Sequence, residues 1–230
     1  AALRWCAWLG FHAAGGVDLA RRDAALRRHV AGALGQADRV GVRDSVTRAA
    51  LGRLGVRARL EADAAAELPP GARERIAMAG AAGAAAQVRA DFPGGYLAVQ
   101  FSADFGDDAT LDLLAQGLRR RAGGRGIVLA RMGVAPWHDD REPFGRLGPR
   151  LGLPWRLFDS LDVWQTCALV SGAAGWIGGS LHGALLARGF AVPATGLERA
   201  PGEGRKLRAW AADWAPGFAV LDPRSFAGEG

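Results

Sequence analysis

The stretch from Gly175 to Thr195, GWIGGSLHGALLARGFAVPAT, contains one complete strand–helix–strand unit. Residues 175–178 form a short apolar run typical of a buried strand, and residues 181–189 are rich in leucine and alanine, as in a helix. A second strand is expected at residues 192–195. Because a helix that links two strands in this way makes a right-handed crossover, we expect the strands to run parallel in one sheet.

The same alternation of strands and helices extends through most of the chain. Further strands are expected at residues 4–11, 39–43, 56–60, 96–101, 126–130 and 157–159, and further helices at residues 17–37, 45–54, 109–121 and 162–173. Residues 64–90, rich in alanine and glycine, are interpreted as a mobile connector or a poorly packed helix. The pattern predicts an α/β fold, a Rossmann-like parallel sheet covered by helices on both faces.

Composition excludes several classes of protein. With half of its 230 residues hydrophobic and 23% charged, the chain has enough apolar material for a packed core and is not disordered. The net charge of +6 includes 23 acidic residues, and no basic run is longer than Arg119–Arg121, so we expect no nucleic-acid partner. Lys206 is the only lysine, which indicates a GC-rich genome. No apolar run reaches the roughly 18 residues of a membrane helix.

The cysteine pattern and the absence of several known catalytic motifs exclude further classes of protein. Cys6 and Cys167 have no CxxC companions, so we expect neither a disulfide framework nor a zinc site, and a reducing, cytoplasmic compartment. The chain lacks the motifs of hydrolases with a GxSxG elbow, dinucleotide-binding dehydrogenases, P-loop proteins and zincins. Residues 135–142 contain His138, Asp139 and a further aspartate, but consecutive side chains cannot all face one ion, so no metal is expected.

The loop at residues 178–183, GGSLHG, is the sharpest candidate for a binding site. Ligands of parallel sheets bind at the carboxyl ends of the strands, and this loop lies at such an end. Two glycines permit a tight turn and a close approach of a ligand, and the following helix offers free N–H groups to a phosphate or carboxylate. His182 would donate a proton or bind the anion. The structural alternative makes Ser180 an N-cap and His182 an ordinary surface residue.

A second loop, residues 42–45, follows the strand at residues 39–43. Arg43 would direct its guanidinium to the same edge of the sheet, where it suits bidentate recognition of a carboxylate or phosphate. Asp44 would either cap the next helix or hold Arg43 in place. The structural alternative leaves an N-cap and an ordinary arginine.

Taken in order, these segments resemble the polysaccharide pyruvyl transferase family. The resemblance rests on VGVRDSVT at residues 40–47 with the later Asp63, on residues 175–197, and on Lys206 shortly after them. It spans roughly residues 36–222. The family pattern reads Gly-Ser-Arg-Leu-His-Gly, and this chain has Ser180 where the family has the arginine before Leu-His.

The resemblance implies the C-terminal half of a GT-B-like fold. Residues 36–230 would form the Rossmann-like α/β domain, and residues 1–35 a strand and helix remaining from an N-terminal half. The implied activity, part of exopolysaccharide biosynthesis, moves pyruvate from phosphoenolpyruvate to hydroxyls of a glycan or glycan precursor as a ketal. It needs neither a metal nor a cofactor, since phosphoenolpyruvate is the donor substrate. Membrane-associated biosynthetic machinery is a compatible partner.

The resemblance also assigns roles to individual residues. His182 would be the catalytic acid or base. Substrate contacts would come from Arg43, Gly179, Ser180, Leu181 and Lys206, with His138 and Asp139 at the rim facing the acceptor sugar.

The serine at position 180 leaves three interpretations open. Ser180 can hydrogen-bond a phosphate but cannot neutralise its charge, so another arginine, such as Arg131 or Arg188, would have to replace the missing one. Otherwise the donor differs, as in a GT-B-type glycosyltransferase that uses a nucleotide sugar, or the protein is a non-catalytic relative.

Overall fold

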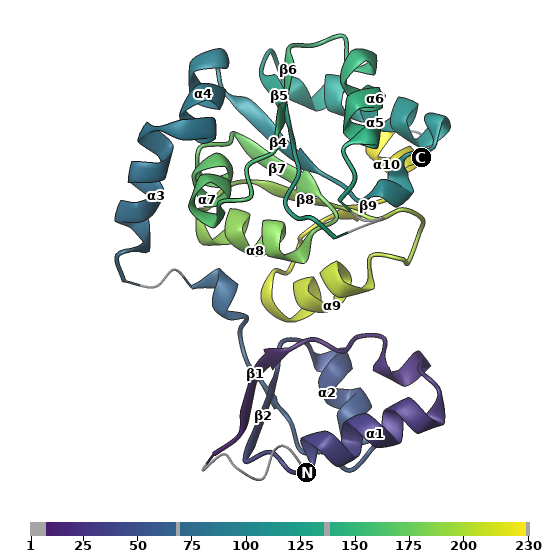
Figure 1. The fold of residues 1–230 in the computed structure, drawn as a ribbon. Coiled ribbons are helices and arrows are strands. Elements are labelled where there is room, and N and C mark those ends of the chain that lie inside the picture. Colours follow the sequence, from purple (N-terminus) through teal and green to yellow (C-terminus); the bar gives the residue numbers. More distant parts are fainter. Residues whose placement is uncertain (1–7, 68–69, 136–138, 229–230) are drawn as a thin grey trace. The chain divides into compact units, whose positions relative to one another are not determined.

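The computed structural model describes residues 8–67, 70–135 and 139–228. The chain divides into two compact units: unit 1 consists of residues 1–67 and 205–217, and unit 2 of residues 68–204 and 218–230. Each unit has its own parallel sheet (Figure 1). The predicted boundary between residues 35 and 36 does not match this division, because β1 (Gly10–Ala14) pairs with β2 (Arg39–Val42) across it. The origin of residues 1–35 in an N-terminal half stays a prediction.

Unit 2 contains a six-stranded sheet with the order β6-β5-β4-β7-β8-β9. Its strands are β4 (Tyr96–Gln100), β5 (Gly126–Ala130), β6 (Trp155–Phe158), β7 (Gly175–Gly178), β8 (Ala194–Leu197) and β9 (Val220–Leu221). The chain builds outward from β4 through β5 to β6, then returns to the other side of β4 and continues from β7 to β9. The strand order therefore reverses between β4 and β7, and in doubly wound sheets such a reversal marks the ligand crevice.

Helices cover both faces of this sheet, as predicted (Figure 1). One face carries α5 (Asp108–Ala122), α6 (Glu142–Arg150) and α10 (Pro223–Ala227), and the other α7 (Val163–Ser171) and α8 (Leu181–Gly189). Every residue of β4 and β5 is buried, as expected for central parallel strands. The core between β5, α5, α6 and α10 includes Leu111, Leu114, Leu118, Ile127, Leu129, Phe144, Leu147 and Phe226.

Residues 64–90 are the clearest departure from the predicted elements. They form a 3₁₀ helix at Ala64–Ala66 and two α-helices, α3 (Ala72–Ala81) and α4 (Gly83–Asp91), that pack against α7. Gln165 of α7 accepts a hydrogen bond from Ala85 N at 2.8 Å and donates one to the carbonyl of Ala79 at 2.9 Å. The small alanine side chains let these helices approach α7 closely, so a lack of large apolar residues does not prevent packing here.

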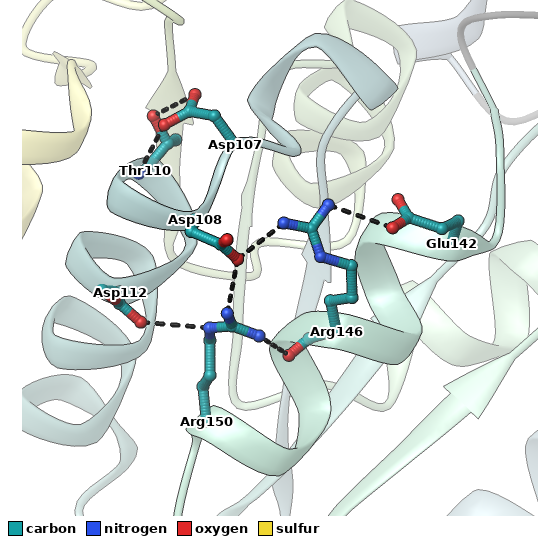
Figure 2. A network of polar contacts seen from close by, with 7 residues as sticks. All are labelled: Asp107, Asp108, Thr110, Asp112, Glu142, Arg146 and Arg150. Atoms are coloured by element: carbon teal, nitrogen blue, oxygen red, sulfur yellow. Dashed lines mark hydrogen bonds and ion pairs between the residues drawn. The ribbon is translucent and has the colours of Figure 1, made fainter.

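A polar network joins the exposed sides of α5 and α6 (Figure 2). Asp108 accepts from Arg146 at 2.6 Å and from Arg150 at 2.5 Å, and Arg150 also contacts Asp112 at 3.0 Å. Surface ion pairs of this kind contribute only about 0–1 kcal/mol each. The alignment of the two helices therefore depends mainly on the apolar core beneath the network.

Unit 1 is built on a three-stranded parallel sheet with the order β1-β2-β3, in which β3 spans Arg59–Leu60. Its helices are a 3₁₀ helix at Leu19–Arg21, α1 (Ala24–Leu34), α2 (Ser45–Gly52) and α9 (Arg205–Trp214). The buried core consists of Leu19, Val40, Val42, Ala50, Leu51 and Val56. Helix α1 has no buried residue, and Leu26 on it is 42% exposed, so α1 packs loosely over this core.

Two findings bear on the predictions from composition. Among the described residues, no helix combines the length and apolar character needed to cross a membrane. Cys167 is buried in α7 with a free thiol, and burial raises the pKa of that thiol. Cys6 lies outside the described residues.

Candidate functional site

A cavity of about 440 Å³ lies in unit 1 at the carboxyl end of β2. One part of its lining is apolar and includes Leu26 and Val30 of α1 and Leu51 of α2. Arg43, which follows β2, and Lys206, from the first turn of α9, also line it. The structure thus brings together the two cations that the sequence singled out as anion contacts, although they are distant in the chain.

Three separate segments of unit 1 fix the position of Arg43. Its Nη1 lies 3.1 Å from Asp63 Oδ2, and both side chains are mostly buried. Its guanidinium packs against Gly15, where a Cβ atom would lie only 2.5 Å from Nη2. The indole N–H of Trp214 donates to the Arg43 carbonyl at 2.7 Å. The guanidinium of Arg43 is therefore held in place, and Asp63 neutralises part of its charge.

Asp44 caps helix α2 and does not hold Arg43. Its Oδ1 accepts from Thr47 N at 2.6 Å and its Oδ2 from the Thr47 hydroxyl at 2.9 Å. The next backbone N–H, of Ser45, donates to Asp213 at 2.6 Å. The sequence predicted the cap but not the contributions of Asp213 and Trp214, because nothing in the local pattern links residues 43–45 to α9.

The charges on the cavity lining favour an anion. Asp44 uses both carboxylate oxygens on Thr47, and Asp18 accepts from Arg205 at 2.6 Å. Within the described part of the chain, the side chains of Arg22 and Lys206 contact no acceptor, and both belong to the lining. Arginine and lysine in this arrangement suit a phosphate or a carboxylate.

In unit 2, the loop between β7 and α8 lies where the strand order reverses. Ser180 is the N-cap of α8, and its hydroxyl accepts from Gly183 N at 3.2 Å. The backbone N–H groups of Leu181 and His182 have no hydrogen-bond partner among the described residues, whereas the Leu181 side chain is buried. The His182 side chain is exposed. The predicted capping role of Ser180 is confirmed, and the ligand roles of Gly179, Ser180, Leu181 and His182 stay predictions.

The glycines of this loop serve close packing. Neither Gly178 nor Gly179 has a positive φ, so neither position needs glycine for a left-handed backbone conformation. A Cβ on Gly178 would lie 2.4 Å from the carbonyl oxygen of Gln100, and one on Gly183 would lie 2.4 Å from the ring of Trp176. Glycine is needed because β4, β7 and α8 approach one another closely.

Two other candidate residues, Asp139 and Arg131, already form polar contacts with residues of this chain. Asp139 Oδ2 accepts from Ala135 N at 3.0 Å. Arg131 lies 3.0 Å from Asp159, so its charge is already compensated. Arg188 lies in the last turn of α8, about 12 Å along the axis from Ser180, too far to replace an arginine there.

His138 lies outside the described residues. In the described part of the chain, no three His, Cys, Asp or Glu side chains are grouped to hold a metal ion.

Gln100 is a site residue that sequence reasoning missed. It ends β4, is 3% exposed, and its Oε1 accepts from Ser180 N at 2.9 Å. A polar residue at the end of an otherwise apolar strand, YLAVQF, was the available signal. Its partner is 80 residues away in the sequence, so only the fold reveals the contact.

Comparison with known proteins is consistent with this architecture. A family model described as polysaccharide pyruvyl transferase matches residues 20–201, which is most of the chain. No curated protein matches.

Two solved structures are similar in fold. The α,α-trehalose 6-phosphate synthase of Burkholderia multivorans has 14% identity and a TM-score of 0.56, over 88% of this chain and 52% of that one. The UDP-forming α,α-trehalose-phosphate synthase of Burkholderia xenovorans has 14% identity and a TM-score of 0.55, over 95% of this chain and 57% of that one. The predicted α/β, GT-B-like fold is confirmed. The chain spans about half the length of these proteins.

Proposed function

Because the chain belongs to the polysaccharide pyruvyl transferase family, we propose that it acts in the transfer of pyruvate from phosphoenolpyruvate to a glycan or glycan precursor. The observation that carries the proposal is the shared cavity of Arg43 and Lys206 in unit 1. The donor has two anionic groups, a carboxylate and a phosphate, and a site for it needs fixed cations. Arg43 and Lys206 are the proposed contacts for these groups.

In the proposed reaction the methylene carbon of phosphoenolpyruvate gains one proton, and the two acceptor hydroxyls each lose one. One acceptor hydroxyl adds to the central carbon of the enol while the methylene carbon takes a proton and becomes a methyl group. A second hydroxyl then displaces phosphate and closes the ketal. His182 is the proposed acid for the methylene carbon, because its imidazole is exposed and an imidazole can donate a proton. His138 and Asp139 remain the proposed contacts of the acceptor sugar.

Ser180 favours a second candidate function, that of a non-catalytic binding protein of the same family. The hydroxyl of Ser180 is used to cap α8, and neither Arg131 nor Arg188 is placed to restore the missing charge. The trehalose-phosphate synthases share only the fold, so a nucleotide-sugar glycosyltransferase is the weaker enzymatic alternative.

Calorimetric titration with phosphoenolpyruvate tests the proposal. We expect wild type to bind, and Arg43→Ala and Lys206→Ala each to weaken binding at least about tenfold, the loss of one charged contact. Arg57→Ala, which removes an exposed arginine of unit 1 outside the cavity lining, is the matched control and should bind like wild type.

A ketal-formation assay separates the candidate functions. With His182→Ala, binding should persist while ketal formation is lost. Binding without ketal formation in wild type would favour the non-catalytic candidate. Failure of wild type to bind phosphoenolpyruvate, with binding of a nucleotide sugar instead, would overturn the proposal.

A further inference from the structure

Arg22 is a further cation on the lining of the cavity in unit 1, beside Arg43 and Lys206. Its side chain is exposed and contacts no acceptor in residues 8–67, 70–135 and 139–228. The function proposed above gives this residue no role. Because its guanidinium keeps its full charge and all of its donors, Arg22 is available to an anion bound in the cavity.

The backbone is fixed on both sides of Arg22. Before it, Leu19 is buried, and the Leu19 carbonyl accepts from Arg22 N at 3.1 Å. After it, Asp23 caps α1, and its Oδ1 accepts from Leu26 N at 2.8 Å. A ligand that binds Arg22 therefore has to order its side chain but not its backbone.

An ion pair connects this segment to the first turn of α9. Arg205 Nε lies 2.6 Å from Asp18 Oδ1, and Asp18 is the N-cap of the 3₁₀ helix that precedes Arg22. Lys206 follows Arg205 directly, and its side chain lines the same cavity as that of Arg22. An anion in this cavity can therefore meet Arg22 from one segment and Lys206 from the other. The ion pair also compensates the charge of Asp18, a lining residue that would otherwise repel the anion.

The charge of the proposed donor supports a role for this extra cation. Phosphoenolpyruvate carries one negative charge on its carboxylate and about 1.5 to 2 on its phosphate near neutral pH. Asp63 cancels part of the charge of Arg43, so Arg43 and Lys206 alone leave much of the donor charge unbalanced. Arg22 and Lys206 have no acidic partner in the described part of the chain, and together they match a doubly charged phosphate.

We propose that Arg22 is a further substrate contact, and that Arg22 and Lys206 together bind the phosphate group of phosphoenolpyruvate. The inference rests on the proposed function. It adds a residue to the donor site and names the group of the donor that this residue recognises.

Arg22→Ala is the direct test of this proposal, and Arg21→Ala is its matched control. Arg21 is the preceding residue, is also exposed and lies outside the cavity lining. The two variants lose the same charge one residue apart, so they change the overall electrostatic field of the protein in nearly the same way. They differ in the contact with the ligand. A third variant, Arg22→Lys, keeps the charge and tests rescue.

Calorimetric titrations with phosphoenolpyruvate and with inorganic phosphate at matched ionic strength give the readout. We expect Arg22→Ala to weaken binding of both about tenfold or more, the loss of one charged contact, and Arg21→Ala to change it less than about twofold. Arg22→Lys should recover most of the lost affinity, because a lysine supplies the same charge. Thermal unfolding of all three variants should stay close to wild type, because both arginines are exposed.

The possible outcomes separate this inference from the proposed function. Phosphoenolpyruvate binding that Arg22→Ala leaves unchanged, or weakens no more than Arg21→Ala does, would overturn the inference and leave the proposed function standing. Weaker binding of phosphoenolpyruvate with unchanged binding of inorganic phosphate would also overturn it, because Arg22 would then contact the carboxylate. Phosphate binding that depends on Arg22, in a wild type that does not bind phosphoenolpyruvate, would support the phosphate contact and overturn the proposed donor. Absence of binding of either probe to wild type would overturn both.

Discussion

Arg43 and Asp63 form an ion pair, with Nη1 of the arginine 3.1 Å from Oδ2 of the aspartate. Arg43 follows β2 and Asp63 follows β3, so the pair links the carboxyl ends of two neighbouring parallel strands. Both residues belong to the pattern that resembles the family, but the pattern did not show that they are partners. The carboxylate orients the guanidinium and at the same time cancels part of its charge.

We therefore expect Asp63→Asn to strengthen anion binding in unit 1. The asparagine keeps an oxygen for the backbone N–H of Ala65, which donates to Asp63 at 3.1 Å, but it no longer neutralises Arg43. Removing an opposing charge at this distance is worth about 1 kcal/mol or more, so phosphate affinity should rise about three- to tenfold in calorimetry. The gain should vanish in the double variant with Arg43→Ala. Unchanged or weaker binding in Asp63→Asn would show that the guanidinium does not reach the ligand.

Gly183→Ala should destabilise unit 2. The new methyl group would lie 2.4 Å from the ring of Trp176, which is 1% exposed and has no room to move away. Overpacking of this kind costs about 1–3 kcal/mol in the free energy of unfolding, measurable by denaturant titration.

The matched control for Gly183→Ala is Gly145→Ala in α6, where nothing lies within 4 Å of the added Cβ. There alanine should be neutral or stabilise by up to about 1 kcal/mol, through its higher helix propensity. Equal effects of the two substitutions would refute the packing explanation.

Tyr96 should ionise at unusually high pH. Burial raises the pKa of this phenol to about 12 from its ordinary value of 10.0, and its hydroxyl donates to the Leu169 carbonyl at 2.6 Å. Since Tyr96 is the only tyrosine, the absorbance of tyrosinate reports on it alone.

The sign of the linkage follows from the raised pKa of Tyr96. The neutral phenol is favoured in the folded state, so this contribution to stability is complete below pH 10 and is lost as the pH rises toward 12. When the protein is unfolded in denaturant, the titration midpoint of Tyr96 should return to its ordinary value of 10.0. A midpoint near 10 in protein shown by circular dichroism to be folded would contradict the burial of this side chain.

The ion pair of Asp112 and Arg150 should contribute little to stability. The Asp112 side chain is 69% exposed and that of Arg150 31%, and the two are joined by a contact of 3.0 Å (Figure 2). A double-mutant cycle with alanine at both positions should give a coupling below about 1 kcal/mol, which decreases further in concentrated salt. A coupling well above that value, unaffected by salt, would mean that the network itself aligns α5 and α6.

The elements that the sequence located best are those with strong hydrophobic patterns. The strands at residues 126–130 and 175–178 and the helix at residues 181–189 have the predicted bounds, because buried parallel strands and the helices that cover them have distinct periodicities. Helices α3 and α4 were not recognised as packed helices, because small alanine side chains leave almost no pattern. Helix α6 was missed because it contains glycines and a proline, although Phe144 and Leu147 make it part of the core.

Some residues of the candidate site could be identified from the sequence, and others could not. Arg43 and Lys206 could be selected from a motif, and the structure places both on one cavity. Gln100 and Trp214 could not be selected, because each acts on a residue far away in the sequence. Gln100 contacts a loop 80 residues later, and Trp214 contacts a carbonyl 171 residues earlier. Only the paired strands and the returning helix bring such residues together.

Unit 1 is assembled from two stretches of chain that the ribosome makes at different times, because residues 205–217 follow the whole of residues 68–204. The strand and loop that carry Arg43 are synthesised before unit 2, whereas Trp214, whose indole donates to the Arg43 carbonyl, and Asp213, whose carboxylate accepts from Ser45 N, are synthesised after most of it. During translation the cavity at Arg43 therefore lacks Lys206 and these restraints until residues 205–217 have been synthesised.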